Sequence, residues 1–329
     1  MLLPVRDAQP TLPACLESLR AQTLADHEVV AVDDGSVDET PAILDAAARA
    51  DPRVRWVRTP ARGLVAALNT ALRRARGGLL ARLDGDDVAH RERLAVQAKT
   101  LDEDDRCAIL GCRVRVVPET GTPSGGMRRY VEWLNGLLGH DDIVRDLFVE
   151  SPLVHPSVMM RAETLRSLGG YRDFAGPEDY DLWLRAHEAG WRFGKRPEVL
   201  LDWRDRPGRL TRRDPRYAAE RFRELKLEAL ERGRLRAARA VVVWGAGPVG
   251  KSWSRALRDR GHSVAAFVEV DPRKLGQQVH GAPVVDVAGA GRFADALHLA
   301  AVGRPGARER IREAARSAGL PEAMLVAVA

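Results

Sequence analysis

Three carboxylates crowd the segment Leu83–Asp87, which reads Leu-Asp-Gly-Asp-Asp and directly follows the apolar residues 78–81. Like charges at the end of a buried strand repel one another unless a cation neutralises them. Carboxylates without a neighbouring His or Cys suit magnesium or manganese better than zinc, and these ions usually complete their coordination with phosphate oxygens. The pattern predicts such a metal site, with Gly85 leaving room for a phosphate. A solvated acidic loop is the simpler alternative.

A second acidic pair, Asp33-Asp34, follows another apolar run and precedes Gly35 and Ser36. Carboxylates at a strand end can accept hydrogen bonds from a base or a ribose. Gly35 lets the chain turn sharply, and Ser36 or Asp38 can cap the next helix. A plain turn with a helix cap explains these last residues but leaves Asp33 without a role.

A third acidic pair, Glu178-Asp179, precedes a segment with apolar residues at Leu182, Trp183 and Ala186. This spacing places the pair at a helix N-terminus, where the helix dipole stabilises a carboxylate. Either residue could therefore serve as a helix cap.

Strand and helix signals alternate through the first third of the chain. Strands are predicted at 4–5, 28–32, 54–57 and 78–81, and helices at 12–21, 40–50 and 63–76. This alternation predicts a parallel sheet with helices on both faces. Ligands of such sheets bind beyond the carboxyl ends of the strands, so both acidic loops are expected at one rim.

The middle of the chain is less regular. We expect a loop at 118–126, a helix at 131–147, a strand at 155–161, a helix at 179–188, a mobile Arg-rich loop at 204–216 and a charged connector helix at 215–238. At Ala240 the pattern restarts with a strand at 241–244, a glycine-rich turn, a helix at 251–260, strands at 264–268, 297–302 and 325–328, and a helix at 307–318. We therefore predict a first domain at 1–215, a connector at 216–238 and a smaller α/β domain at 239–329.

Several motifs in the first 215 residues occur together in one order. They are residues 4–8, 15–23, 32–40, 63–69, 82–87, 155–158 and 177–183. With these motifs the segment resembles a family 2 glycosyltransferase of the GT-A fold. The resemblance implies an α/β fold: a GT-A domain with a mixed, mostly parallel sheet, followed by a smaller Rossmann-like domain.

The resemblance also implies roles for the acidic loops. Asp33 and Asp34 are expected to hold the nucleotide of a sugar donor. Asp86 is expected to hold a manganese or magnesium ion on the donor diphosphate, with Asp84 helping through the ribose or a water. Asp87 is expected instead to begin the following segment. The metal would assist departure of the nucleoside diphosphate as a Lewis acid.

The family places its catalytic base in the Glu-Asp element. We expect Asp179 to take the proton from an acceptor hydroxyl, with Glu178 as its orienting partner or as the alternative base. A single displacement opposite the leaving diphosphate would invert the anomeric carbon. His155 would border the diphosphate or the acceptor, with a plain core or surface histidine as the alternative. Arg206 stands where many relatives have a His, and it could clamp the diphosphate.

The turn Gly245-x-Gly247-x-x-Gly250 lies between a predicted strand and helix, as a dinucleotide or phosphate fingerprint requires. Glu269 or Asp271 could then meet a ribose. The unit resembles the Rossmann-like domains found beside sugar acyltransferases and some methyltransferases, which leaves a nucleotide in this domain as a second candidate ligand. The same glycines could instead serve tight packing of strand and helix.

Composition narrows the class of protein. The 329 residues carry a net charge of +6, are 45% hydrophobic and have a mean hydropathy of −0.27, which fits a soluble globular protein. No apolar window approaches the roughly 18 residues of a membrane span, and the first residues are charged too soon for a signal peptide. We predict a cytoplasmic protein, either free or peripheral to the inner face of a membrane. A start upstream of Met1 stays open, since relatives usually carry more apolar residues before Pro4.

The net positive charge does not by itself indicate that the protein binds nucleic acid. Arginines alternate with acidic residues along predicted helices, which is typical of a solvated face, and no aromatic-basic interleaving is present. The cysteines Cys15, Cys107 and Cys112 are odd in number and form no close pair, so neither a disulfide framework nor a zinc site is expected.

The leading function is an inverting, metal-dependent transfer of sugar from a nucleotide sugar, with UDP-sugar as the expected donor, to a glycan, glycolipid or small-molecule acceptor. One alternative is a nucleotidyltransferase, which would need a glycine-rich basic loop near the first strand, where residues 4–11 offer only Arg6. Another is a noncatalytic sugar-nucleotide sensor. The motifs do not encode the acceptor, the nucleotide base or the oligomeric state.

Overall fold

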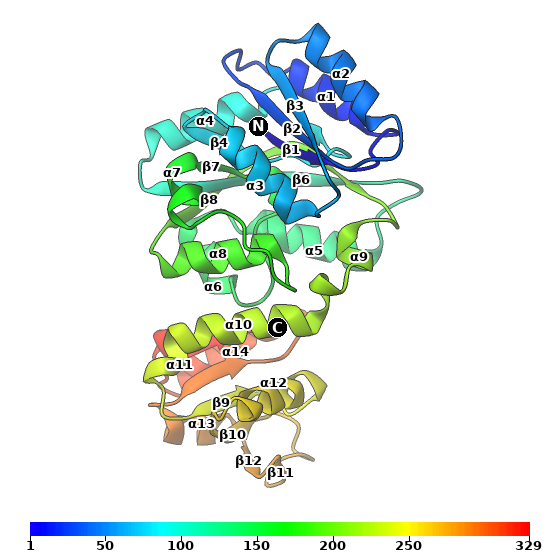
Figure 1. Cartoon of the computed structure of the whole chain (residues 1–329). Coiled ribbons are helices and arrows are strands. Elements are labelled where there is room, and N and C mark those ends of the chain that lie inside the picture. The colour runs from blue at the N-terminus through cyan, green and yellow to red at the C-terminus, as the bar shows by residue number, and fades with distance from the viewer. The chain divides into compact units, whose positions relative to one another are not determined.

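The computed structural model describes all 329 residues, which separate into two units (Figure 1). The first comprises Met1–Ile143 and Ser151–Ala218, and the second comprises Val144–Glu150 and Ala219–Ala329. The predicted connector, 216–238, is thus divided between them. None of the helices combines the length and the apolar character that crossing a membrane requires.

The first unit begins with alternating strands and helices. In chain order these are β1 (Leu2–Val5), α1 (Leu12–Arg20), β2 (Val29–Asp34), α2 (Thr40–Ala50), β3 (Val54–Thr59), α3 (Leu64–Arg74) and β4 (Leu79–Ala81). The first three strands pair in parallel in the order β1-β2-β3. The chain after β4 returns to the other side of β1, where Leu2 and Arg82 form a parallel bridge. The predicted alternation is confirmed for these elements.

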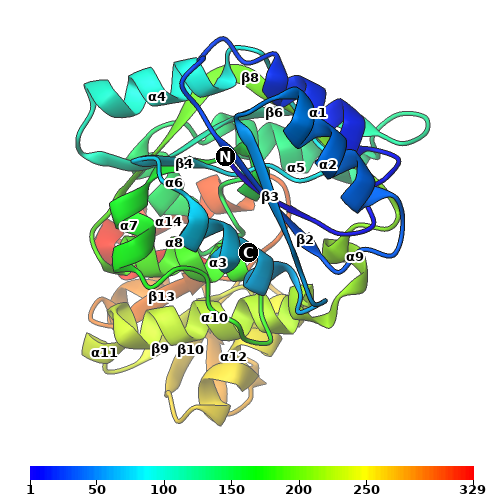
Figure 2. The ribbon, with the colours of Figure 1, turned by 45° about the horizontal axis from the view of Figure 1, so that its top comes forward.

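The helices of this part of the chain lie on both faces of the β1-β2-β3 sheet, because the connections between its strands run in two directions. The chain moves from β1 outward to β3 and then back past β1, and parallel crossovers are right-handed. Therefore α1 and α2, which lie side by side in Figures 1 and 2, cover one face, whereas α3 packs against β1 and β2 from the other. All carboxyl ends of these strands point to the same rim, where Asp33, Asp34 and Asp84 are found.

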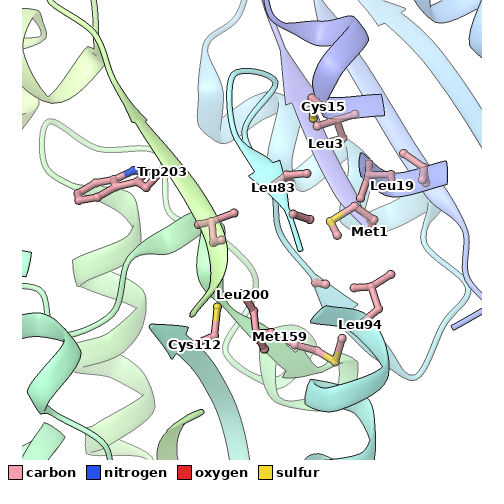
Figure 3. Close-up of a cluster of buried hydrophobic side chains, with 14 of the residues drawn as sticks. Met1, Leu3, Cys15, Leu19, Leu83, Leu94, Cys112, Met159, Leu200 and Trp203 are labelled. Carbon is pink, nitrogen blue, oxygen red and sulfur yellow. The ribbon is translucent and has the colours of Figure 1, made fainter. Parts of the chain in front are cut away.

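A second, mixed sheet completes this unit. It contains β5 (Val88–Ala89), β6 (Cys107–Pro118), β7 (Met159–Arg161) and β8 (Arg192–Asp205) in the order β4-β7-β6-β8-β5. The long strands β6 and β8 run parallel, while β7 is antiparallel to both of its neighbours, β4 and β6. A single core of buried side chains joins elements from both sheets, including Leu3, Leu83 and Trp203 (Figure 3).

Several expected elements in the middle of the chain were wrong. The helix predicted at 131–147 is two helices, α5 (Gly125–Gly136) and α6 (His140–Asp146), because Leu137 is extended. The strand predicted at 155–161 begins only at Met159, since Pro156 favours a 3₁₀ turn, η1 (His155–Ser157).

The predicted Arg-rich loop also contains regular structure. Strand β8 extends to Asp205, and the short helix α9 (Leu210–Arg213) and the 3₁₀ turn η2 (Pro215–Tyr217) follow. The connector helix begins only at Ala219, as α10 (Ala219–Arg232), and a break at Gly233 separates it from α11 (Arg234–Ala237).

The second unit holds one six-stranded sheet. Its elements include β9 (Val241–Trp244), α12 (Pro248–Asp259), β10 (Val264–Val268), β11 (Gln278–Val279), β12 (Ala282–Val285), α13 (Val287–Ala290), β13 (Leu297–Ala300), α14 (Ala307–Ser317) and β14 (Leu325–Ala327). The strand order is β11-β12-β10-β9-β13-β14, and only β11 is antiparallel to its neighbour. The strands predicted here are confirmed.

Candidate active site

The three carboxylates after β4 lie together. One oxygen from each of Asp84, Asp86 and Asp87 falls within 4.8 Å of the others. Gly85 allows close packing here, because a Cβ at this position would lie 2.8 Å from Cγ1 of Val5 on β1, and its predicted room for a phosphate stays a prediction. The glycine therefore lets the acidic turn pack against the first strand.

Asp87 is the innermost member of this acidic trio, with only 1% of its surface exposed. Its Oδ1 accepts a hydrogen bond of 2.9 Å from the backbone N–H of Arg204, while its buried Oδ2 has no partner. Burial raises the pKa of the Asp87 carboxyl, and the charges of Asp84 and Asp86 raise it further. The prediction that Asp87 merely begins the next segment was incomplete, because its position in the same turn brings it into the cluster.

Two arginines balance part of the negative charge. Nη1 of the buried Arg82 lies 2.5 Å from Oδ2 of Asp84. The guanidinium of Arg206 donates to Oδ2 of Asp86 from Nη2 at 2.7 Å and from Nε at 3.1 Å. Arg206 thus contacts a predicted metal ligand, and its expected contact with a diphosphate stays a prediction. An all-oxygen set with one unpaired, buried oxygen fits a hard divalent cation.

The pair Glu178-Asp179 opens helix α8 (Glu178–Glu188), as predicted, but Pro177 occupies the N-cap position. Glu178 is 2% exposed, and its Oε2 accepts a 2.8 Å hydrogen bond from the hydroxyl of Tyr217. Its Oε1 lies 3.5 Å from Nδ1 of His155. Burial raises the pKa of Glu178, but His155 and Tyr217 outweigh burial and leave the pKa below its usual range. Asp179 is the more exposed of the two carboxylates.

His155 is a buried residue that serves Glu178. Its Nε2 lies 3.0 Å from the hydroxyl of Tyr171, and Trp183 meets its ring edge-on at 6.0 Å. Burial lowers the pKa of His155, and the charge of Arg82 lowers it further, so the ring is neutral at neutral pH. The expected contact of His155 with a diphosphate or acceptor stays a prediction.

The Asp33-Asp34 pair organises its own surroundings. Both oxygens of Asp34 accept backbone N–H groups, from Arg62 at 2.8 Å and from Gly63 at 2.9 Å. Asp33 accepts the N–H of Ser36 at 3.0 Å, and its other oxygen lies 3.3 Å from Nε of Arg58. These contacts give both residues a local role in shaping the rim, and their contact with a nucleotide stays a prediction.

The loop held by Asp34 borders a cavity of about 310 Å³ between the end of β3, helix α3 and the chain before α8. Its polar lining includes Thr59, Arg62, Asn69, Arg73 and Asp173. Guanidinium, amide and hydroxyl groups around a partly apolar floor suit a polar organic ligand.

In the second unit, two of the three fingerprint glycines are explained by packing. A Cβ on Gly250 would lie 1.8 Å from the carbonyl oxygen of Gly245, and Gly245 itself has a φ of +100°. A Cβ on Gly247 would meet nothing within 4 Å. The carboxylate of Glu269 accepts a hydrogen bond from the N–H of Ala246 and pairs with Lys274. A ribose at this position would have to compete with these two groups for Glu269. A nucleotide in this unit stays a prediction.

Comparison with known proteins identifies the class. Residues 1–169 match the model of Glycosyl transferase family 2. The amylovoran biosynthesis glycosyltransferase AmsE of Erwinia amylovora is 32% identical over 198 residues, which are 60% of this chain and 71% of AmsE. The chain belongs to glycosyltransferase family 2, and its activity is glycosyl transfer.

Solved structures agree on the fold. S. aureus TarS in complex with UDP-GlcNAc superposes with a TM-score of 0.53 at 19% identity, over 70% of this chain and 65% of that TarS chain. The mannosyltransferase PcManGT of Pyrobaculum calidifontis, in complex with GDP-Man and Mn²⁺, gives 0.51 at 20% identity, over 78% and 77% of the two chains. The predicted GT-A fold is confirmed.

Proposed function

We propose that the protein is an inverting, metal-dependent glycosyltransferase that uses a UDP-sugar donor. The observation that carries this proposal is the convergence of Asp84, Asp86 and Asp87 within 4.8 Å in the unit that also presents Glu178-Asp179 at the start of α8. Family membership supports the reaction class, and the UDP-GlcNAc complex of TarS supports the donor class.

The acidic trio is the proposed binding site for Mn²⁺ or Mg²⁺. Asp86 and Asp84 would hold the ion, together with Asp87 through its unpaired Oδ2. When bound, a divalent cation neutralises the charge that develops on the departing diphosphate. Arg206, already at Asp86, adds a second positive group where that charge appears.

Asp179 is the proposed general base. It accepts the proton of the acceptor hydroxyl while that oxygen forms a bond to the anomeric carbon. The bond from this carbon to the diphosphate oxygen breaks on the opposite face, and the nucleoside diphosphate leaves with the electron pair. Glu178, which accepts a hydrogen bond from Tyr217 and lies beside His155, orients the start of α8 and does not itself take the proton.

The cavity beside Arg62 is the proposed place for the nucleotide base, because it lies next to the Asp33-Asp34 turn and offers amide and guanidinium donors. The named role of AmsE in amylovoran biosynthesis supports a glycan or glycolipid acceptor. We place the reaction at the inner face of the membrane, where a lipid-linked acceptor would be presented.

The test is release of nucleoside diphosphate by the purified chain with Mn²⁺ and a panel of UDP- and GDP-sugars. Chelation by EDTA should stop release, and the anomeric proton coupling in the NMR spectrum of the product should report inversion. Release of pyrophosphate would indicate nucleotidyl transfer instead. Tight donor binding with no release from any donor would indicate a sensor.

A further inference from the structure

Tyr217 lies outside every motif that suggested the activity, yet it contacts the base element. It ends the 3₁₀ turn η2, and its hydroxyl donates the 2.8 Å hydrogen bond to Oε2 of Glu178 across 39 positions of sequence. Burial raises the pKa of Tyr217, and the carboxylates of Glu178 and Asp179 raise it further. The phenol therefore stays protonated and acts only as a donor toward Glu178.

The opposite oxygen of Glu178 completes a chain of buried polar groups. His155 faces it through Nδ1, and the other ring nitrogen of His155 lies against the hydroxyl of Tyr171. Nδ1 of His155 lies 3.5 Å from Oε1 of Glu178 and makes no hydrogen bond, so this contact is electrostatic, whereas Nε2 shares a hydrogen bond with the Tyr171 hydroxyl. The hydroxyl of Tyr217 therefore supplies the hydrogen bond that orients the Glu178 side chain, while His155 lies beside the other oxygen.

The residues before Tyr217 hold the acidic trio. The N–H of Arg204 binds Asp87, and the guanidinium of Arg206 binds Asp86. Between these contacts and Tyr217, Arg212 pairs with Asp205, and Arg209 lies 4.0 Å above the ring of Trp203. One continuous stretch, which we call the 204–217 segment, therefore contacts both acidic elements of the site.

We propose that Tyr217 is a positioning residue that holds Glu178 beside the base Asp179 and joins the base element to the 204–217 segment. This inference rests on the proposed function, since it assigns the base to Asp179. The charged and titratable groups around Glu178 are His155 from η1, Tyr217 from η2, Arg82 after β4, Tyr171, and Asp179 of its own helix.

The variant Tyr217→Phe removes only the donating hydroxyl. We expect kcat for nucleoside diphosphate release to fall about 10- to 100-fold, the range for losing a hydrogen bond to a charged group, with the KM of the donor unchanged. Because the Tyr217 hydrogen bond helps to lower the pKa of Glu178, the acid limb of the pH profile should move to higher pH. Tyr130→Phe, on α5, removes a hydroxyl remote from Glu178 in sequence and element and serves as the matched control.

A double-mutant cycle with Glu178→Gln tests whether Tyr217 acts through Glu178. The double variant should be no slower than Glu178→Gln alone, whereas multiplicative losses would overturn the proposal. Wild-type kcat and pH profile in Tyr217→Phe would overturn it as well.

A titration of ¹³C-labelled glutamate carboxyls by NMR separates this inference from the proposed function, because it needs no turnover. The pKa of Glu178 should rise in Tyr217→Phe, and an unchanged value would contradict the coupling even in a protein inactive with every donor. Conversely, a raised pKa together with no release in the wild type would leave the contact standing and refute only the transferase assignment.

Discussion

Arg206 and Asp86 form an ion pair in which Nη2 lies 2.7 Å from Oδ2, so a guanidinium occupies the carboxylate expected to bind a metal ion. The pair is only partly shielded, with 34% of the arginine side chain and 18% of the aspartate side chain exposed. An arginine here neutralises charge but offers no lone pair to a metal. A cation and Arg206 must therefore compete for, or share, this carboxylate.

Removing this competitor should strengthen metal binding. For Arg206→Ala we expect the donor-free protein to bind Mn²⁺ several-fold more tightly, while the KM for the donor rises because the diphosphate loses a positive neighbour. Electron paramagnetic resonance of free Mn²⁺ measures the first effect. Arg212→Ala, which removes an arginine paired with Asp205 in the same segment, is the control. Unchanged or weaker Mn²⁺ binding in Arg206→Ala would speak against competition.

Asp87 should matter for metal binding as much as Asp86 does. Asp87→Asn keeps an oxygen for the N–H of Arg204 but removes the charge of the unpaired Oδ2. We expect at least about a 10-fold loss of Mn²⁺ affinity, together with a higher melting temperature of the metal-free protein, since like charges no longer face one another. If Mn²⁺ titration shows wild-type affinity in Asp87→Asn but not in Asp86→Asn, Asp87 has a structural role only.

Replacing Asp179 should slow the transfer reaction without weakening donor binding. Asp179→Asn should bind UDP as the wild type does, yet lose about 100-fold or more in nucleoside diphosphate release, as expected for loss of a general base. Calorimetry with UDP and a turnover assay check the two halves. Glu163→Gln changes an exposed carboxylate outside the acidic elements and the cavity, and it should leave the pH profile in place. Full turnover by Asp179→Asn would remove it from the base role.

Two substitutions in the glycine turn of the second unit test whether its glycines are required for packing. Gly250→Ala places a methyl group against the carbonyl of Gly245 and should cost about 3 kcal/mol of unfolding free energy, at the upper end of the usual range for overpacking. Gly247→Ala, with open space around its Cβ, should change stability by no more than about 1 kcal/mol. Urea denaturation compares the two variants. Equal stability of both would show that the strand and helix can separate at little cost.

Buried Lys195 should give the wild type a pH-dependent stability. Its ammonium contacts the carbonyls of Leu134 and Pro152, and burial lowers its pKa to about 7. Between this value and the roughly 10.4 of an unfolded lysine, the unfolded chain binds more protons, so stability rises with pH. Lys195→Met should lack this rise.

Urea denaturation at pH 6.5, 8 and 9.5 measures the effect as the difference between wild type and variant. The exposed Lys99, substituted by Met, provides the control because its side chain stays in water. Parallel pH dependences for wild type and Lys195→Met would contradict the expected contribution.

The sequence predicted those parts of the fold that depend on local pattern. The β1–β4 alternation, the acidic turns at strand ends and the restart at β9 follow from runs of apolar residues broken by Asp, Gly and Ser. Strands β6 and β8 were not predicted. Gly194 and Pro197 interrupt the apolar pattern of β8, and the two strands pair across a long separation in sequence, which local pattern does not show.

The site itself was predictable as a set of carboxylates but not as a network. Asp34 accepts the backbone N–H groups of Arg62 and Gly63, and Arg206 pairs with Asp86. Both contacts join segments that are distant in sequence. Tyr217 had no sequence signal at all, since a single tyrosine before a charged helix is typical of a surface. Such contacts depend on tertiary geometry, which periodicity does not encode.

The 204–217 segment also has a consequence for evolution and engineering. The backbone N–H of Arg204 and the side chains of Arg206 and Tyr217 each donate to a different acidic residue, so the number of residues between them is constrained. Insertions or deletions here would displace one of these contacts relative to the others. Homologues suitable for exchanging this region should therefore have a segment of the same length.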